Sequence, residues 1–376
     1  MAHTLALWCQ PLKTAISTRT YDLTNVHSGG HDGTVLHNVV TMDQAIALGI
    51  GRRSVYRLVD RGDWVRLGEG IFLTTPSTGD DARWKAELAG LILRYPNAMI
   101  SHRAAARLHA MEGVIERAAE ATVSAVAHRA PPGVHRTRHL DPGPVLVDGL
   151  TTTSIVRTLR DLAAVRPAFM VEQALESMLR GSDPRRPDQW KTALLAELRR
   201  SVEDGLRLPG TFRLRAVLEL RNDVDRPTGS FPETLLFQML RGIGFHAVRQ
   251  PTLRITDGSG VTLDTFFPDI ALPQFRSLVE VDGAEAHSGS AALARDLRRQ
   301  NKILRGFRLF RYPAIDILRD ARSIALEIRR DAFRSTPVDE SWCHDGVSVT
   351  YSTNEFVVVD AARDARTEAR LRRRVG

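Results

Sequence analysis

The segment from Asp264 to His287 constrains the fold of this chain more than any other stretch. It contains two short apolar runs, 269–272 and 277–281, which are separated by Pro273 and a turn-like Gln-Phe-Arg. Short runs of apolar and β-branched residues bounded by proline or Asp-Gly are typical of strands. The sequence therefore predicts two neighbouring strands in an α/β domain.

Three carboxylates belong to this strand pair. Neighbouring strands would bring Asp269 close to Glu280 and Asp282. Carboxylates in one place repel each other, so a site that keeps them ionised usually contains a cation. Oxygen ligands without a cysteine or histidine pair favour Mg²⁺ or Mn²⁺ over Zn²⁺. Asp269, Glu280 and Asp282 are therefore the candidate metal ligands, and Asp264 is an alternative to Asp269.

A simpler interpretation needs no site. Asp282-Gly283 can be a hairpin turn, Glu280 can lie on a solvent-facing strand edge, and Asp269 can start a turn after a proline. The valines on both sides of Glu280 favour the site, because alternation along a strand sends them to the opposite, buried face.

Several residues recur here in an order that resembles the DUF559 family. They are Asp269 with Pro273, Glu280-Val-Asp282-Gly, His287, Asp296 with Arg299, and Gly306-Phe. These small domains are related to the very-short-patch-repair endonucleases of the PD-(D/E)XK nuclease superfamily, and the resemblance covers roughly residues 226–335.

The resemblance implies metal-dependent hydrolysis of phosphodiester bonds in DNA, serving defence or repair. Asp269 and Glu280 would hold Mg²⁺ (or Mn²⁺), Asp282 would assist, and His287 would shuttle a proton. Asp282 stands where the superfamily has its lysine, so Arg299 or Lys302 would stabilise the developing charge instead.

Glu233 has two interpretations. Ser230-Phe-Pro-Glu233 before an apolar run is a capping box, which by itself explains the glutamate. Nucleases of this superfamily often carry a glutamate on the first helix that reaches the metal or its water. Both remain open at this point.

Residues 36–75 carry a second pattern, in which a helix, a glycine turn and a second helix precede a short β-wing. Thr41 or Asp43 would cap the first helix, whose apolar face would be Ala45, Ile46 and Leu48. This order predicts a winged helix-turn-helix. Its second helix would present five side chains to DNA, either in the major groove or at phosphates: Arg52, Arg53, Tyr56, Arg57 and Arg61.

The same stretch resembles the N-terminal domain of AbiEi-type antitoxins of type IV toxin–antitoxin systems. Leu48-Gly49, Arg61-Gly-Asp-Trp64 and Gly70-Ile-Phe72 carry the likeness, and two later segments, 98–106 and 153–162, extend it. The resemblance implies an alternative function, a transcriptional regulator with a cognate toxin as partner and an inactive nuclease-like domain.

The rest of the chain is expected to connect or to bind. Ser101 is predicted to cap a helix, His102 and His109 to pack or lie at the surface, and Arg157 with Asp161 to form an ion pair on a helix surface. The predicted middle-domain helices are 81–95, 102–111, 154–164, 167–180 and 188–204, and the predicted strands are 121–127 and 145–148.

The expected organisation is a multi-domain α/β chain with an α+β middle domain and a restriction-endonuclease-like α/β/α domain with a mixed sheet. The domain limits are 1–35 (tail), 36–80 (winged helix), 81–204 (middle), 205–229 (linker around a helix at 211–221), 230–335 (nuclease-like) and 336–376 (basic tail).

Composition agrees with a DNA partner. The net charge is +8, and residues 295–334 alone contain 12 Lys and Arg against 5 Asp and Glu. This segment includes Arg298, Arg299 and Lys302, which would bind phosphates beside the metal site. Two cysteines suggest neither a disulfide framework nor a zinc site, and no apolar run is long enough for a membrane span. We therefore expect a cytoplasmic protein.

Overall fold

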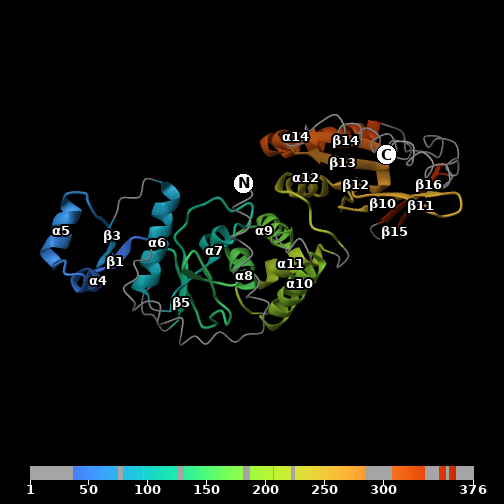
Figure 1. Cartoon of the computed structure of the whole chain (residues 1–376). Coiled ribbons are helices and arrows are strands. Elements are labelled where there is room, and N and C mark those ends of the chain that lie inside the picture. The colour runs from blue at the N-terminus through green and yellow to red at the C-terminus, as the bar shows by residue number, and fades with distance from the viewer. Residues whose placement is uncertain are drawn as a thin grey trace, which may run out of the picture. The chain divides into compact units, whose positions relative to one another are not determined.

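The computed structural model describes residues 37–74, 79–95, 97–125, 131–180, 187–205, 207–221, 225–283, 307–334, 347–352 and 355–360 of the 376-residue chain. The chain divides into two compact units, Met1–Glu219 and Leu220–Gly376 (Figure 1). Each unit buries apolar cores of its own. Helices and several sheets of mixed direction make this a mixed α/β protein.

The first unit opens with two helices against a small antiparallel sheet of strand order β1-β3-β2. The elements are β1 (Val39–Thr41), α4 (Met42–Ala47), α5 (Arg52–Asp60), β2 (Val65–Gly68) and β3 (Ile71–Leu73). Thr41 caps α4 in a capping box with Gln44, whose amide oxygen accepts from the Thr41 backbone N–H at 2.8 Å. This arrangement fits the predicted winged helix.

The apolar face expected for the first helix is partly wrong. Ala45 is buried, but Ile46 and Leu48 are 43% and 61% exposed, and Met42 takes their place in the core. The helix is only six residues long and ends before Gly49, whose φ of 84° turns the chain. Met42 and Ala45, near the start of the helix, therefore make its contact with the core.

Helix α6 (Asp80–Arg94) joins the wing to a five-stranded mixed sheet of order β6-β5-β4-β8-β7. Leu88 and Ala89 of this helix belong to the same core as Ile71 of the wing and Ile100 of the larger sheet. The sheet strands are β4 (Met99–Ile100), β5 (Ala121–Ser124), β6 (Val134–Thr137), β7 (Val145–Val147) and β8 (Leu150–Thr152). The predicted strands near 121–127 and 145–148 are present, and the other three were not predicted.

Four helices complete the first unit around one apolar core. They are α8 (Ile155–Val165), α9 (Ala168–Arg180), α10 (Pro187–Asp204) and α11 (Thr211–Glu219). Helix α11 lies inside the segment expected to be a linker, but its Leu214, Val217 and Leu218 are buried in this core. A large part of that segment thus belongs to the packed first unit.

The Arg157–Asp161 pair is not the surface ion pair expected. Arg157 Nε donates to Asp161 Oδ1 at 2.7 Å, and both residues are buried, with 7% and 6% exposed. The Arg157 guanidinium also donates to the carbonyl of His139, so the segment before Asp141 covers the pair. Removing one partner of a buried ion pair lowers the unfolding free energy far more than removing one partner of an exposed pair.

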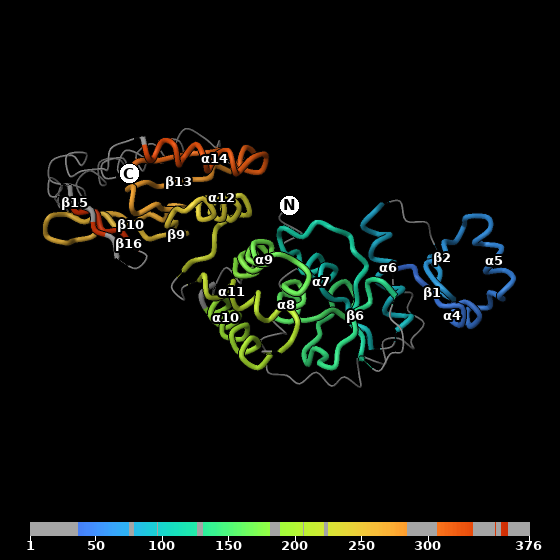
Figure 2. Tube along the Cα trace, turned by 180° about the vertical axis from the view of Figure 1, so that it is seen from behind, coloured from blue at the N-terminus to red at the C-terminus, as the bar shows by residue number. Residues whose placement is uncertain are grey.

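In the second unit a four-stranded sheet of order β14-β13-β12-β9 has two helices on one face. Figures 1 and 2 show α14 lying along β13 and β14. The elements are α12 (Phe231–Gly242), β9 (Val248–Arg249), β12 (Ile270–Leu272), β13 (Ser277–Asp282), β14 (Arg308–Pro313) and α14 (Ala314–Arg334). β13 runs parallel to β14, so Asp282-Gly283 is not a hairpin turn.

A second sheet, of order β11-β10-β16-β15, covers the opposite face. Its strands are β10 (Thr252–Asp257), β11 (Thr262–Phe266), β15 (Val347–Ser352) and β16 (Glu355–Asp360). Phe356 of β16 is 1% exposed and packs edge-on against Phe307 with ring centroids 5.2 Å apart. Part of the segment expected to be a basic tail, 336–376, therefore belongs to the core of the second unit.

No helix in the part of the chain that the structure describes is both long enough and apolar enough to span a membrane.

Candidate functional site

Helix α5 is held in place from one side only. Val55 is fully buried among Val40, Trp64 and Phe72, whereas the N-terminal half of the helix otherwise points to solvent. Gly51 is the N-cap, and Gly62, with φ of 78°, turns the chain after the last turn. The helix is thus fixed to the wing sheet by its apolar stripe and presents its opposite face.

That face carries the side chains expected to contact DNA. Arg52, Arg53, Tyr56 and Arg57 are all exposed. Arg57 donates to Ser54 Oγ at 3.1 Å, and the Tyr56 ring packs edge-on against Phe72 with centroids 6.3 Å apart. Arg61 differs from the rest, because its guanidinium is paired with Asp63.

The position of two arginines strengthens the positive potential of α5. Arg52 and Arg53 occupy the first turn, where the helix dipole is positive and disfavours cations. An anion at this end would interact with both the guanidinium groups and the backbone N–H groups of the helix start. The N-terminal end of α5 therefore combines two features that would favour an anion, exposed arginines and unpaired helical N–H groups.

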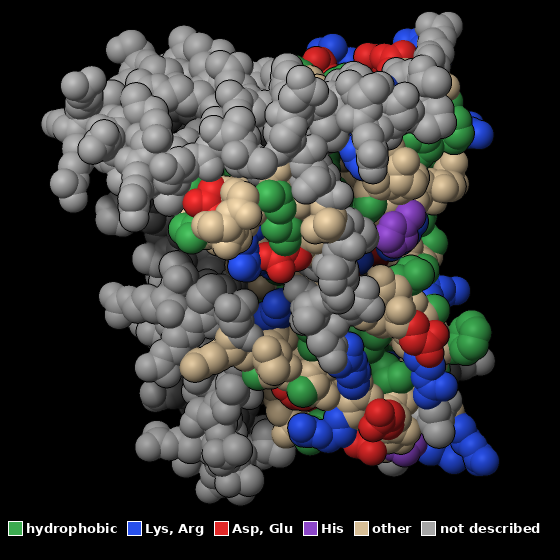
Figure 3. Space-filling view, turned by 90° about the vertical axis from the view of Figure 1, so that its right-hand side faces the viewer, with side chains coloured by type: hydrophobic (Ala, Val, Ile, Leu, Met, Phe, Trp, Pro, Cys, Tyr) green, Lys and Arg blue, Asp and Glu red, His purple; other side chains and the backbone are tan. Residues whose placement is uncertain are grey.

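Elsewhere, charges of both signs are mixed. On the face shown in Figure 3, basic and acidic side chains of the described residues lie among apolar ones. The described part of this face is therefore not uniformly basic.

A carboxylate cluster lies in the second unit. The antiparallel register pairs Ile270 with Val279, and one step further it places Asp269 opposite Glu280. The Val281 backbone N–H donates to Asp269 Oδ2 at 2.7 Å, which holds the aspartate against β13. Alternation along β12 and β13 puts Asp269 and Glu280 on the same face of the sheet, that of Ala271 and Leu278.

Gln250 links this pair to Glu233. Its side-chain amide donates to Glu233 Oε2 at 2.8 Å and to Asp269 Oδ1 at 3.1 Å. Burial, followed by the charge of Glu233, raises the pKa of Asp269 to about 7, and Glu280 adds to the effect. The cluster therefore favours either a shared proton or a bound cation at neutral pH.

The two interpretations of Glu233 meet in one side chain. Ser230 caps α12, accepting from the Glu233 backbone N–H at 3.4 Å, as the capping pattern predicts. The Glu233 carboxylate also accepts from the backbone N–H of Gly229 at 2.6 Å and from the Ser230 hydroxyl at 2.8 Å. Since it also meets Gln250, the glutamate both secures the helix start and borders the cluster.

Asp264 lies apart from this arrangement, and Asp282, on the same face of β13 as Glu280, makes a different contact. Asp282 pairs with Arg311 of β14, with an N–O distance of 2.7 Å, which directs its carboxylate to the neighbouring strand. Asp264 lies on β11 of the other sheet, opposite Ile255. Of the predicted ligands, the structure brings together Asp269 and Glu280, with Glu233 beside them.

The remaining predicted residues are not described. His287, Arg298, Arg299 and Lys302 lie in 284–306, outside the described residues, so their roles stay predictions. Among the described residues, no three His, Cys, Asp or Glu side chains are grouped as a metal site. Magnesium can be bound through one or two carboxylates together with substrate phosphates, and Asp269 with Glu280 fits that smaller requirement.

Sequence reasoning missed Gln250 and a buried cluster in the first unit. Ser101 was expected to cap α7 (His102–Leu108), but its hydroxyl instead lies 2.9 Å from His102 Nδ1 and accepts from Thr122 at 2.7 Å. His102 stacks on His135 with ring centroids 3.5 Å apart. A glutamine after a strand and a serine before a helix carry no distinctive sequence pattern, so nothing indicated these contacts.

The exposed helix α5 and the wing have the arrangement of a winged helix. Residues 36–75 match the family model described as "Transcriptional regulator, AbiEi antitoxin". This match covers the winged helix and none of the second unit. A search of curated proteins found no match to the chain.

Proposed function

We propose that this protein is a DNA-binding transcriptional regulator of the antitoxin kind. The exposed arginines at the start of α5 are the observation that carries the proposal. They lie within the segment that matches the regulator family. A helix of this type contacts the major groove with its N-terminal residues, and arginines there read guanine or hold phosphates.

A cognate toxin is the second partner in this proposal. The winged helix accounts for only a small part of the chain, so the mixed sheet and the four-helix core remain available to bind a protein. In a system of this kind, a regulator that binds DNA near its own gene can also neutralise the toxin encoded beside it. Co-expression with a neighbouring nucleotidyltransferase gene tests this: growth arrest by that gene alone and recovery with the regulator are expected.

Fluorescence anisotropy tests DNA binding. Two labelled duplexes of equal length are compared, one from upstream of the protein's own gene and one unrelated. We expect tighter binding to the first duplex, and weaker binding of that duplex by the triple variant Arg52→Ala, Arg53→Ala, Arg57→Ala. The matched control removes three exposed arginines elsewhere in the first unit: Arg83, Arg138 and Arg200. Equal loss in both variants would mean that net charge alone governs binding.

The carboxylate pair supports a second candidate function, metal-dependent hydrolysis of DNA. The supporting observation is the juxtaposition of Asp269 and Glu280 on one face, with Glu233 joined to them through Gln250. In this proposal the second unit is a nuclease domain resembling DUF559, as the order of its residues suggests. Asp282 pairs with Arg311, and its part as a ligand stays a prediction.

In this second candidate, Asp269 and Glu280 would hold Mg²⁺ or Mn²⁺. The ion would supply Lewis-acid polarisation of a phosphoryl oxygen and a more acidic bound water. Gln250 positions Asp269, while the Val281 N–H fixes the carboxylate orientation. Nicking of plasmid DNA with Mn²⁺, lost in Glu280→Gln but kept in Asp264→Asn, is the expected result. Cleavage that survives Glu280→Gln would refute this second function.

A further inference from the structure

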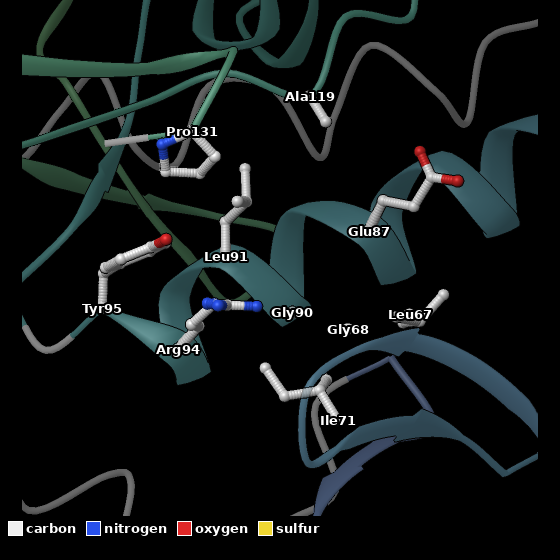
Figure 4. Close-up of a pocket in the computed structure, with 10 residues that line it drawn as sticks. All are labelled: Leu67, Gly68, Ile71, Glu87, Gly90, Leu91, Arg94, Tyr95, Ala119 and Pro131. Carbon is white, nitrogen blue, oxygen red and sulfur yellow. The ribbon is translucent and has the colours of Figure 1, made fainter. Parts of the chain in front are cut away.

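A cavity of about 580 Å³ lies in the first unit, between the wing and helix α6 (Figure 4). This volume is within the range of sites for small organic ligands. Leu67 and Ile71 of the wing form one wall and Leu91 of α6 another, with Pro131 across from them. The cavity is therefore lined largely by apolar side chains from segments distant in the sequence.

A glycine on α6 shapes the floor. A Cβ built at Gly90 would lie 3.6 Å from Ile71 Cγ2 and 3.8 Å from Leu67 Cδ1. Any longer side chain at this position would extend into the space between helix and wing. Gly90 thus lets α6 lie close to the wing, and a long side chain at this position would have to displace Leu67 or Ile71.

Polar groups reach the cavity from the end of α6. The Arg94 guanidinium extends across the space above Ile71, and the Tyr95 hydroxyl points toward Leu91 (Figure 4). Arg94 makes two exposed contacts: an ion pair with Glu69 that is 3.9 Å long, and a cation–π contact in which its Cζ lies 5.7 Å from the centroid of the Tyr95 ring. A ligand could therefore bind the Arg94 guanidinium with little loss of existing interactions.

The nearby acidic side chain does not cancel this charge. Glu87 lines the cavity, but its carboxylate points away from Arg94 in Figure 4. It lies 3.4 Å from Arg83, one turn earlier on the same helix. Arg94 is therefore the cationic group that lines the cavity, with Glu69 as its exposed partner 3.9 Å away.

We propose that this cavity binds a small organic anion with a flat apolar body. The body would lie between Leu67, Ile71 and Leu91, and the anionic group would accept hydrogen bonds from Arg94. The site involves neither α5 nor the carboxylates of the second unit. It stands or fails independently of the DNA-binding and nuclease proposals.

Two dyes test the proposal on the full chain. 8-Anilinonaphthalene-1-sulfonate has an aromatic body and one sulfonate, and N-phenyl-1-naphthylamine has the same body without the charge. We expect saturable binding of both to the wild type. Arg94→Ala should weaken binding of the sulfonate about tenfold, as for the loss of a charge-assisted hydrogen bond, and change the neutral dye less than twofold.

Three further variants sharpen the result. Arg94→Lys should recover part of the sulfonate affinity, and Arg319→Ala, which removes an exposed arginine of the second unit, should change nothing. Gly90→Leu should weaken binding of both dyes, provided that its thermal unfolding remains cooperative. Unchanged sulfonate binding in Arg94→Ala, or no saturable binding by the wild type, would overturn the proposal whatever Gly90→Leu does.

Discussion

Replacement of His102 should remove a specific part of the protein's sensitivity to acid. Ser101 Oγ accepts from Thr122 and lies 2.9 Å from His102 Nδ1, so the Ser101 hydroxyl hydrogen can donate to this nitrogen when the ring is neutral. This bond needs a ring nitrogen without a proton. Burial, with the neighbouring His135 adding to it, lowers the pKa of His102 to about 3.

The sign of the effect follows from proton linkage. In the unfolded chain His102 has an ordinary histidine pKa of about 6.5. Below that pH the unfolded chain therefore binds a proton at His102 that the folded chain does not bind. Stability is therefore unaffected above pH ~6.5 and decreases as the pH falls toward 3. Between pH 7 and pH 5 the expected loss of unfolding free energy is about 2 kcal/mol.

His102→Asn is the informative variant. An asparagine amide oxygen can accept the Ser101 hydroxyl, and asparagine tolerates the positive φ of 54° found at this position. Urea unfolding at pH 7 and pH 5 can be followed by tryptophan fluorescence, because Trp64, Trp84 and Trp190 lie in the first unit. His246→Asn, at an exposed position of the second unit, is the matched control.

The wild type should lose about 2 kcal/mol more between the two pH values than His102→Asn does, and His246→Asn should behave as the wild type. Other groups that titrate in this range cancel in the comparison between proteins. Equal pH dependence in the wild type and His102→Asn would refute the conclusion that folding keeps this histidine neutral.

Three further predictions concern packing. Phe72→Ala should lower the unfolding free energy of the first unit by about 3–5 kcal/mol in urea and abolish DNA binding, whereas Phe72→Leu should lower it much less. Equal losses in the two variants would contradict the placement of Phe72 in the core of the winged helix. Asp161→Leu should lower the unfolding free energy by about 3–5 kcal/mol, because it leaves Arg157 buried without its partner. The double variant Arg157→Met, Asp161→Leu should recover most of this loss. If the effects of the two substitutions were additive, the pair would not be coupled. Deletion of residues 336–376 should lower the thermal unfolding temperature of the second unit, because it removes Phe356 and Val358 from the core around Leu253; an unchanged transition would show that this segment is dispensable.

Local patterns were enough to predict elements whose residues are close in sequence. The turn at Gly49–Gly51 and the alternation after Trp64 indicated α5 and the wing, and the apolar runs around Pro273 indicated β12 and β13. The hairpin of β10 and β11 was missed, although Asp257-Gly-Ser-Gly260 is a turn sequence and Asp257 accepts from Val261 N–H at 3.0 Å.

Long-range partners were beyond such reasoning. β16 pairs in parallel with β10 across roughly a hundred residues, and no short sequence pattern specifies that choice. The spacing of Arg157 and Asp161 predicted their contact but not its burial, which depends on the segment around His139. The strand register brings Asp269 opposite Glu280, whereas the diversion of Asp282 to Arg311 depends on β14, whose register the sequence did not determine.

The salt dependence of DNA binding tests the central claim most directly. Fluorescence anisotropy across a salt series gives log K against log salt concentration for the wild type and for the triple variant Arg52→Ala, Arg53→Ala, Arg57→Ala. If each arginine contacts a phosphate, each loss flattens the slope by about 0.9, or about 2.7 for all three. The control variant lacking Arg83, Arg138 and Arg200 should keep the wild-type slope. A triple variant that binds DNA with the wild-type slope and affinity would contradict DNA binding through α5.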